Sequence, residues 1–146
     1  MQNTRNLDML ASAMLDLLGF LNSPQRDEAL LKEAGVRLDR ALFPLLVILG
    51  ARGSLGVAEL ADQVGRDHTT VSRQLAKLES LDLVARYEGD DRRKRAARLT
   101  TAGKKTVRAI TQARRRLLSK ALAQWSETDR AALADLNRRF AEALAR

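Results

Sequence analysis

The strongest constraint on the fold of this chain is a three-residue joint, residues 65–67, between two short segments with helical periodicity. The first segment, residues 57–64, gathers its apolar side chains on one face of a helix. Gly65 can take the left-handed conformation that ends a helix, and Asp67 is a good N-cap for a second helix over residues 68–80. A connection of this length holds two helices against each other at a fixed angle.

The second helix carries two contrasting faces. Val71, Leu75 and Leu78 are spaced by four and three residues, so they form an apolar stripe that packs into a core. The remaining positions carry short hydroxyls, an amide and long cations, which are side chains that bond to base edges and phosphates. We therefore expect a nucleic-acid-contacting surface made of His68, Thr69, Thr70, Ser72, Arg73, Gln74 and Lys77.

A hairpin is expected after this helix. Residues 83–87 and 95–99 are typical of strands, and the polar residues 88–94 between them are typical of a hairpin tip. This order of elements, a helix, a tight turn, a polar-faced helix and a basic hairpin, is that of a winged helix-turn-helix. In this motif the second helix fits the major groove of DNA, and the hairpin, called the wing, places cations along the DNA. The candidate wing contacts are Asp91, Arg92, Arg93, Lys94 and Arg95.

The net charge of +8 is concentrated in one stretch of the chain. Residues 86–120 carry 13 basic and 3 acidic side chains, residues 1–85 carry 9 and 11, and residues 121–146 carry 4 of each. A concentrated basic block attracts a polyanion such as a nucleic acid. A solvated helix face plus a loop explains the charge equally well, so charge alone leaves both interpretations open.

The other segments are expected to be helical, which makes the chain mainly α with a small β-hairpin wing. Residues 26–34 form a short helix closed by Gly35, and an apolar, buried helix follows Asp39. If Asp39 capped this helix, Pro44 would lie beyond the first turn, where proline disrupts a regular helix. Its position implies either an irregular turn before the helix or a kink within it.

Two helices are expected in the last third of the chain. A long helix, capped by Thr100 or Thr101, runs to Trp125, which we interpret as a core or interface anchor rather than part of a ligand pocket. Residues 126–129 have the spacing of a capping box and open a final helix. Its inward-facing residues are expected to be Leu133, Leu136, Phe140 and Leu144.

The N-terminal segment carries a heptad seam. Its apolar residues recur at alternating steps of three and four, as in a helix that packs along another helix. The partner is either the core of the same chain or a second copy, and the regularity of the seam favours a second copy. We expect one domain, with residues 1–36 and 101–146 as dimerisation helices and residues 53–100 as the DNA-binding lobe. The expected dimer contacts are Leu7, Leu10, Met14, Leu17, Leu21, Leu133, Leu136 and Phe140.

The composition excludes several function classes. The chain contains no cysteine, which excludes a thiolate metal site, a disulfide scaffold and a thiol switch. It contains one histidine, and we expect no metal and no cofactor. The same scarcity leaves no Ser–His–Asp or Cys–His set for nucleophilic catalysis, so we expect no enzyme. There is no apolar run of about 20 residues and no secretory signal, so we expect a cytoplasmic chain without a membrane partner.

Two motifs resemble the MarR family of bacterial regulators. The first runs from Glu59-Leu60-Ala61 through residues 65–75 to Leu83-Val84. The second, Asp91-Arg92-Arg93 followed by Leu99-Thr100-Thr101-Ala102-Gly103, is similar to the wing signature D-x-R and L-T-x-x-G of that family. With the order of helices, the resemblance covers essentially the whole chain.

The resemblance implies a homodimer that binds a palindromic operator in double-stranded DNA, usually as a repressor. It implies a recognition helix at residues 68–80 and a wing at residues 88–98, where Asp91 pairs with a neighbouring arginine. It also implies release by a small phenolic or anionic ligand. We expect a ligand pocket lined by apolar residues of the first, third and long helices with arginines nearby, suited to an aromatic or aliphatic acid.

Two positions depart from the family pattern. Asp82 stands where glycine is usual, so it is expected to adopt a positive φ at some strain. Gly56 precedes the first helix of the motif where serine or threonine is commoner, so that helix is expected to have a weak cap.

Two other functions for the DNA-contacting surface fit the sequence less well. An architectural protein that coats DNA by charge alone predicts uniformly basic helices, which the hydroxyl and amide side chains of the second motif helix argue against. A protein-binding module without DNA affinity is disfavoured by the intact wing.

Overall fold

The computed structural model describes residues 2–88 and 95–146. Their contacts group into two compact units, and the boundary lies between Ala113 and Arg114, inside the long helix α6 (Thr101–Ala121). The first unit contains the winged helix-turn-helix. The second contains the end of α6 and the last helix.

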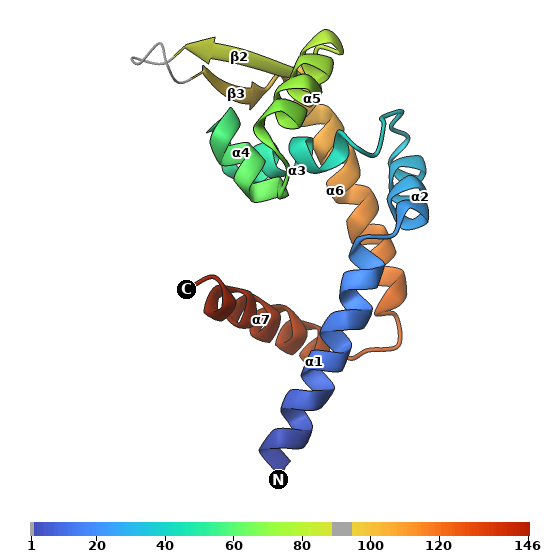
Figure 1. The fold of residues 1–146 in the computed structure, drawn as a ribbon. Helices are drawn as coiled ribbons and strands as arrows, with labels where there is room; N and C mark the ends of the chain where they lie inside the picture. Colours follow the sequence, from blue (N-terminus) through green and yellow to red (C-terminus); the bar gives the residue numbers. More distant parts are fainter. Residues whose placement is uncertain (1, 89–94) are drawn as a thin grey trace. The chain divides into compact units, whose positions relative to one another are not determined.

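The secondary structure confirms a mainly α chain with a small antiparallel sheet (Figure 1). Within residues 2–88 and 95–146, no helix combines the length and apolar character needed to cross a membrane. In chain order, the elements are α1 (Gln2–Leu21), α2 (Pro24–Ala34), α3 (Phe43–Arg52), β1 (Ser54–Gly56), α4 (Val57–Val64), α5 (His68–Ser80), β2 (Val84–Glu88), β3 (Arg95–Leu99), α6 and α7 (Glu127–Leu144).

The sheet has three strands in the order β1-β3-β2, so the hairpin has a partner that the sequence did not predict. β1 pairs antiparallel with β3 and sets Leu55 opposite Ala97, and both side chains are buried. A three-residue strand is too short to show an alternating pattern in the sequence. β1 joins the end of α3 to the start of α4, so it anchors the hairpin to the helix-turn-helix.

The core of the first unit lies between α3, α4, α5 and the sheet. Leu45, Leu46 and Leu49 of α3 are essentially inaccessible, as the apolar composition of this helix predicted. The predicted stripe of α5 packs against them. A second cluster joins α2, α3 and α6 through Leu30, Leu31, Phe43, Ile110 and Ala113.

An irregular turn precedes α3, which settles the two alternatives raised by Pro44. The backbone N–H of Ala41 donates to Oδ1 of Asp39 over 2.9 Å, and the helix begins only at Phe43. Pro44 therefore lies in the first turn of α3, where its missing N–H costs no helical hydrogen bond.

The start of α6 is fixed by a close contact with the segment before β2. Asp82 has a φ of 61°, as predicted, and its carbonyl accepts a hydrogen bond from Oγ1 of Thr100 over 2.7 Å. Oγ1 of Thr100 also accepts from the N–H of Gly103, so Thr100 caps the helix. A Cβ on Gly103 would overlap the carbonyl oxygen of Leu83, because α6 passes directly against that backbone.

The second unit differs from the sequence prediction at the end of α6. The helix stops at Ala121, and Trp125 lies beyond it in a turn, so the prediction of a helix as far as Trp125 is wrong. The guanidinium of Arg130 holds this turn by donating to the carbonyl of Leu122 from Nε over 3.0 Å and from Nη2 over 2.7 Å. Ser126 caps α7, as predicted, by accepting from the N–H of Asp129.

Helices α1 and α7 keep their apolar side chains outside any core of the chain. None of the described residues of either helix is buried. Leu133, Leu136 and Leu144 are exposed, which corrects the prediction that they face inward, and Phe140 is half-buried. Leu7, Leu10, Met14, Leu17 and Leu21 of the heptad seam are also exposed.

Candidate nucleic-acid interface

The turn between α4 and α5 is built as the sequence predicted. Gly65 ends α4 with a φ of 68°, and Asp67 caps α5. Oδ1 of Asp67 accepts from the backbone N–H of Thr70 over 2.8 Å, and Oδ2 accepts from the Thr70 hydroxyl over 2.6 Å. Gly56 offers α4 no side-chain cap, as expected, although its own N–H donates to Glu59.

The expected DNA-contacting residues of α5 differ in how accessible they are. Thr70 directs its hydroxyl at Asp67, and the amide oxygen of Gln74 accepts a hydrogen bond from Arg66 over 2.8 Å. The exposed members are His68, Thr69, Arg73 and Lys77, and the half-buried members are Thr70, Ser72 and Gln74.

An arginine that the sequence analysis did not single out ties the sheet to α5. Nη2 of Arg86, on β2, donates to the backbone carbonyl of Ser72 over 3.1 Å. Its Nε lies 3.5 Å from Oε2 of Glu79, which is the distance of an ion pair rather than of an aligned hydrogen bond. Because these contacts join residues seven to fourteen positions apart across a turn, helical or strand periodicity gives no sign of them.

The wing tip is only partly within the described residues. Asp91, Arg92, Arg93 and Lys94 lie outside them, and Arg95 is described through its backbone, which opens β3 opposite Glu88. Farther along β3, the guanidinium of Arg98 lies over the Tyr87 ring, 4.5 Å from its centroid. The hydroxyls of Tyr87 and Ser54 are 2.7 Å apart, so this side of the sheet is bonded to β1.

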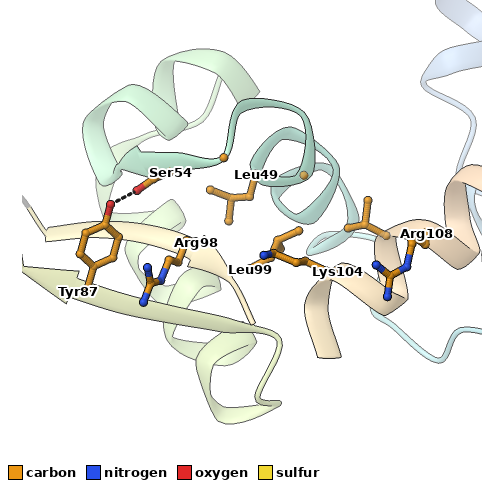
Figure 2. Close-up of a pocket in the computed structure, with 10 residues that line it drawn as sticks. Leu49, Ser54, Tyr87, Arg98, Leu99, Lys104 and Arg108 are labelled. Atoms are coloured by element: carbon orange, nitrogen blue, oxygen red, sulfur yellow. Dashed lines mark hydrogen bonds between the residues drawn. The ribbon is translucent and has the colours of Figure 1, made fainter. Parts of the chain in front are cut away.

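A pocket of about 460 Å³ opens between α3, the sheet and the start of α6, within the first unit (Figure 2). Leu49, Leu99 and Val107 give it apolar walls, which come from α3, β3 and the long helix α6. Tyr87 of β2 and Arg98 of β3 line another side, and α1, which the sequence analysis expected at a ligand pocket, contributes none of the residues that line this one. Basic side chains at the pocket belong to Arg98, Lys104 and Arg108.

The described residues show no cluster of three or more histidine, aspartate or glutamate side chains that would hold a metal ion. The exposed side chains of α5 that we expected to contact DNA are His68, Thr69, Arg73 and Lys77, which supply hydrogen-bond donors, a hydroxyl and positive charge.

Comparisons with known proteins place this architecture in one family. A sequence model of the MarR family matches residues 38–94. The uncharacterized HTH-type transcriptional regulator YxaD of Bacillus subtilis is 32% identical over 107 residues, which cover 73% of this chain and 75% of YxaD. The chain belongs to the MarR family. Its winged helix-turn-helix is accordingly that of a DNA-binding transcription regulator.

Solved structures share the fold of this MarR chain. A MarR family protein from Bacillus stearothermophilus has a TM-score of 0.82 at 21% identity, with 98% of each chain covered. A mutant of MepR from S. aureus, bound to an oligodeoxyribonucleotide, has a TM-score of 0.57 at 23% identity, with 97% of each covered. NadR in complex with 4-hydroxyphenylacetate has a TM-score of 0.64 at 19% identity, with 92% of each covered.

The cap of α5 generates a prediction about pH. Hydrogen bonds from the Thr70 hydroxyl and then from its N–H favour the ionised carboxylate, so they lower the pKa of Asp67 below its usual value of 3.8. A lowered pKa in the folded state adds stability above pH 3.8, and this stability is lost as the pH falls through the folded pKa. We expect Asp67→Asn, which retains a capping oxygen but no titration, to remove this component.

Urea denaturation at a series of pH values measures the effect. The free energy of unfolding of the parent should decline more steeply than that of Asp67→Asn below pH 3.8. Asp62→Asn, the same substitution on α4, should follow the parent. Parallel curves for the parent and Asp67→Asn would contradict the proposed role of the carboxylate.

Proposed function

We propose that this MarR-family protein is a cytoplasmic, homodimeric, sequence-specific repressor without enzymatic activity that binds a palindromic operator in double-stranded DNA and is released by a small acid. The observation that carries the proposal is the surface of α5. It presents two long cations, Arg73 and Lys77, beside the hydroxyl of Thr69, and all three are exposed. Cations contact phosphates or guanine, while hydroxyls and amides discriminate between bases.

The bracing of α5 supports sequence-specific binding over coating by charge alone. The apolar stripe is buried in the core, Asp67 fixes the first turn, and Arg86 holds the backbone at Ser72. A helix fixed at three places presents its side chains in one geometry, which base readout requires. Binding by charge alone needs no such geometry.

Arg73→Ala tests the role of the recognition helix. If Arg73 contacts a guanine, the substitution should weaken operator binding by about 1–3 kcal/mol per half-site and relax the base preference at one position. Arg115→Ala, which removes the same charge from an exposed position on α6, is the matched control. Fluorescence anisotropy with operator and random duplexes at fixed salt measures both effects. Equal losses for both variants on both duplexes would refute base readout by Arg73.

The proposed dimer rests on the apolar surfaces of α1 and α7. Leu7 and Leu17 are each 56% exposed and Leu136 is 55% exposed, although they recur at the spacing of helices that pack together. A soluble monomer rarely exposes so many large apolar side chains, whereas a second copy would bury them. Two-fold symmetry would then set the two recognition helices about 34 Å apart, one turn of DNA.

The mass in solution tests the dimer. Light scattering at micromolar concentration should give about twice the 16.2 kDa of one chain. Leu17→Glu places a charge in the heptad seam and should shift the mass toward one chain, while Ser12→Glu, on the opposite face of α1, should not. A parent protein that is monomeric at these concentrations would overturn the proposal.

The pocket between α3, the sheet and α6 supports release by an acid. Its apolar walls suit an aromatic or aliphatic body, and Lys104 and Arg108 suit a carboxylate. A ligand that prefers a dimer geometry unable to span two half-sites would release the DNA. A 100-fold change in DNA affinity requires that the ligand bind one dimer geometry only about 2.7 kcal/mol more tightly than the other.

Salicylate, titrated into the protein–operator complex, tests this part of the proposal. It should release the DNA, and Lys104→Met should raise the concentration required, whereas Lys105→Met, next in sequence and outside the pocket, should not. Mild peroxide should have no effect, because the chain contains no cysteine thiol to oxidise. Release by peroxide without methionine oxidation, or equal effects of the two lysine variants, would contradict it.

A further inference from the structure

The pocket between α3, the sheet and the start of α6 carries more positive charge than one acid group balances. Three of the side chains that line it are cationic, namely those of Arg98, Lys104 and Arg108, and all three are exposed. None of the described residues that line the pocket is an aspartate or a glutamate. The ion pairs formed within residues 2–88 and 95–146 involve other side chains. A ligand in this pocket therefore meets three cations and no competing carboxylate.

The three cations come from two sides of the pocket. Lys104 and Arg108 are four positions apart on α6, so they lie on one face of that helix. Arg98 comes from β3. Figure 2 shows Arg98 and Arg108 on opposite sides of Leu49. The positive charge is therefore divided between a sheet side and an α6 side rather than gathered at one point.

The guanidinium of Arg98 is oriented by an aromatic ring. Its Cζ lies over the ring of Tyr87, 4.5 Å from the centroid. The hydroxyl of Tyr87 is in turn 2.7 Å from the hydroxyl of Ser54, which fixes the ring against β1. Stacking on a ring engages the flat face of a guanidinium and leaves the N–H groups along its edge, whose fork matches a carboxylate. The sheet side of the pocket thus offers a pre-oriented site for one acid group.

The α6 side offers a second site for an acid group. Side chains four positions apart on a helix reach the same small region, so Lys104 and Arg108 can bind one carboxylate together. Leu49, Leu99 and Val107 supply hydrocarbon walls in the same pocket. Its volume of about 460 Å³ lies within the range of about 300–1,000 Å³ that is typical of small-molecule sites.

We propose that this pocket recognises a dicarboxylic acid with an apolar body, one carboxylate of which is bound by Arg98 and the other by Lys104 and Arg108. The inference rests on the proposed acid site in this pocket. It adds that the ligand carries two acid groups, held apart by its apolar body. A monocarboxylate such as salicylate would satisfy only one side of the pocket, so it should bind more weakly than a dicarboxylate of suitable length.

Calorimetric titration of the protein without DNA tests the inference. Linear dicarboxylates from succinate to sebacate are compared with their monomethyl esters, which keep the carbon chain and lose one negative charge. The best dicarboxylate should bind about tenfold more tightly than its monoester, because it gains a forked, charge-assisted contact. Its affinity should also pass through a maximum as the chain lengthens, since a chain that is too short cannot span the two sides. Equal affinities of diacids and monoesters throughout the series would overturn the inference.

Arg98→Met separates the two sides of the pocket. The substitution removes the charge and keeps an unbranched apolar stem beside Tyr87. The dicarboxylate should then bind only as tightly as its monoester, whereas the monoester, held on the α6 side, should bind almost as it does to the parent. Lys104→Met should weaken both ligands. Arg98→Lys restores the charge without the fork, so it should recover part of the lost dicarboxylate affinity.

Lys105→Met is the matched control for charge. It removes the same positive charge from a position next to Lys104 but outside the pocket, so both ligands should bind as they do to the parent. Equal losses of dicarboxylate affinity in Arg98→Met and Lys105→Met would indicate general attraction by a basic protein and overturn the inference. Thermal denaturation establishes whether Arg98→Met is folded, and if it is not, the comparison of diacid and monoester on the parent decides alone.

Release of DNA is measured separately, by fluorescence anisotropy of the operator complex, so the inference and the proposed function can fail independently. A dicarboxylate that binds more tightly than its monoester and releases the operator supports both. Tighter binding without release supports the inference and overturns release by this ligand class. Release with equal affinities of diacid and monoester overturns the inference alone. Absence of binding by every diacid also overturns the inference, and the salicylate titration then decides whether an acid releases the DNA.

Discussion

The burial of one apolar stripe organises the DNA-binding unit. Val71, Leu75 and Leu78 are fully buried beneath α5, so the rotation of that helix about its axis is set by the core and not by its polar residues. Every exposed group on the helix takes its direction from this packing. The cap at Asp67 and the contact between Arg86 and the Ser72 carbonyl then limit sliding and tilting.

Local signals in the sequence predicted much of this unit. The turn at Gly65, the cap at Asp67 and the positive φ of Asp82 each depend on one or two residues in a fixed local geometry. The same holds for the cap at Ser126 in the second unit. Such features are encoded over three or four positions, which is the range over which residue type and spacing are informative. Helical periodicity also predicted the buried stripe of α5, which is formed by Val71, Leu75 and Leu78.

What the sequence did not predict depends on contacts between distant segments. β1 is recognisable only through its pairing with β3, which is about 40 positions away. The bonds of Arg66 to Ala41 and Gln74, and of Arg86 to Ser72, join elements whose approach is set by the core. The prediction that the long helix extends to Trp125 was wrong for a different reason. The apolar side chain of Trp125 continues the pattern of α6, although the backbone already forms a turn at Leu122.

The tyrosine and the tryptophan of this chain are intrinsic fluorophores that lie in different units. The chain contains one tyrosine and one tryptophan. Tyr87 lines the pocket beside Arg98 in the first unit, and Trp125 lies in the turn before α7 in the second. Light of long enough wavelength excites the tryptophan alone, and the difference from shorter-wavelength excitation reports the tyrosine. The surroundings of the pocket in the first unit and of the turn before α7 in the second therefore give separate signals in the unmodified protein.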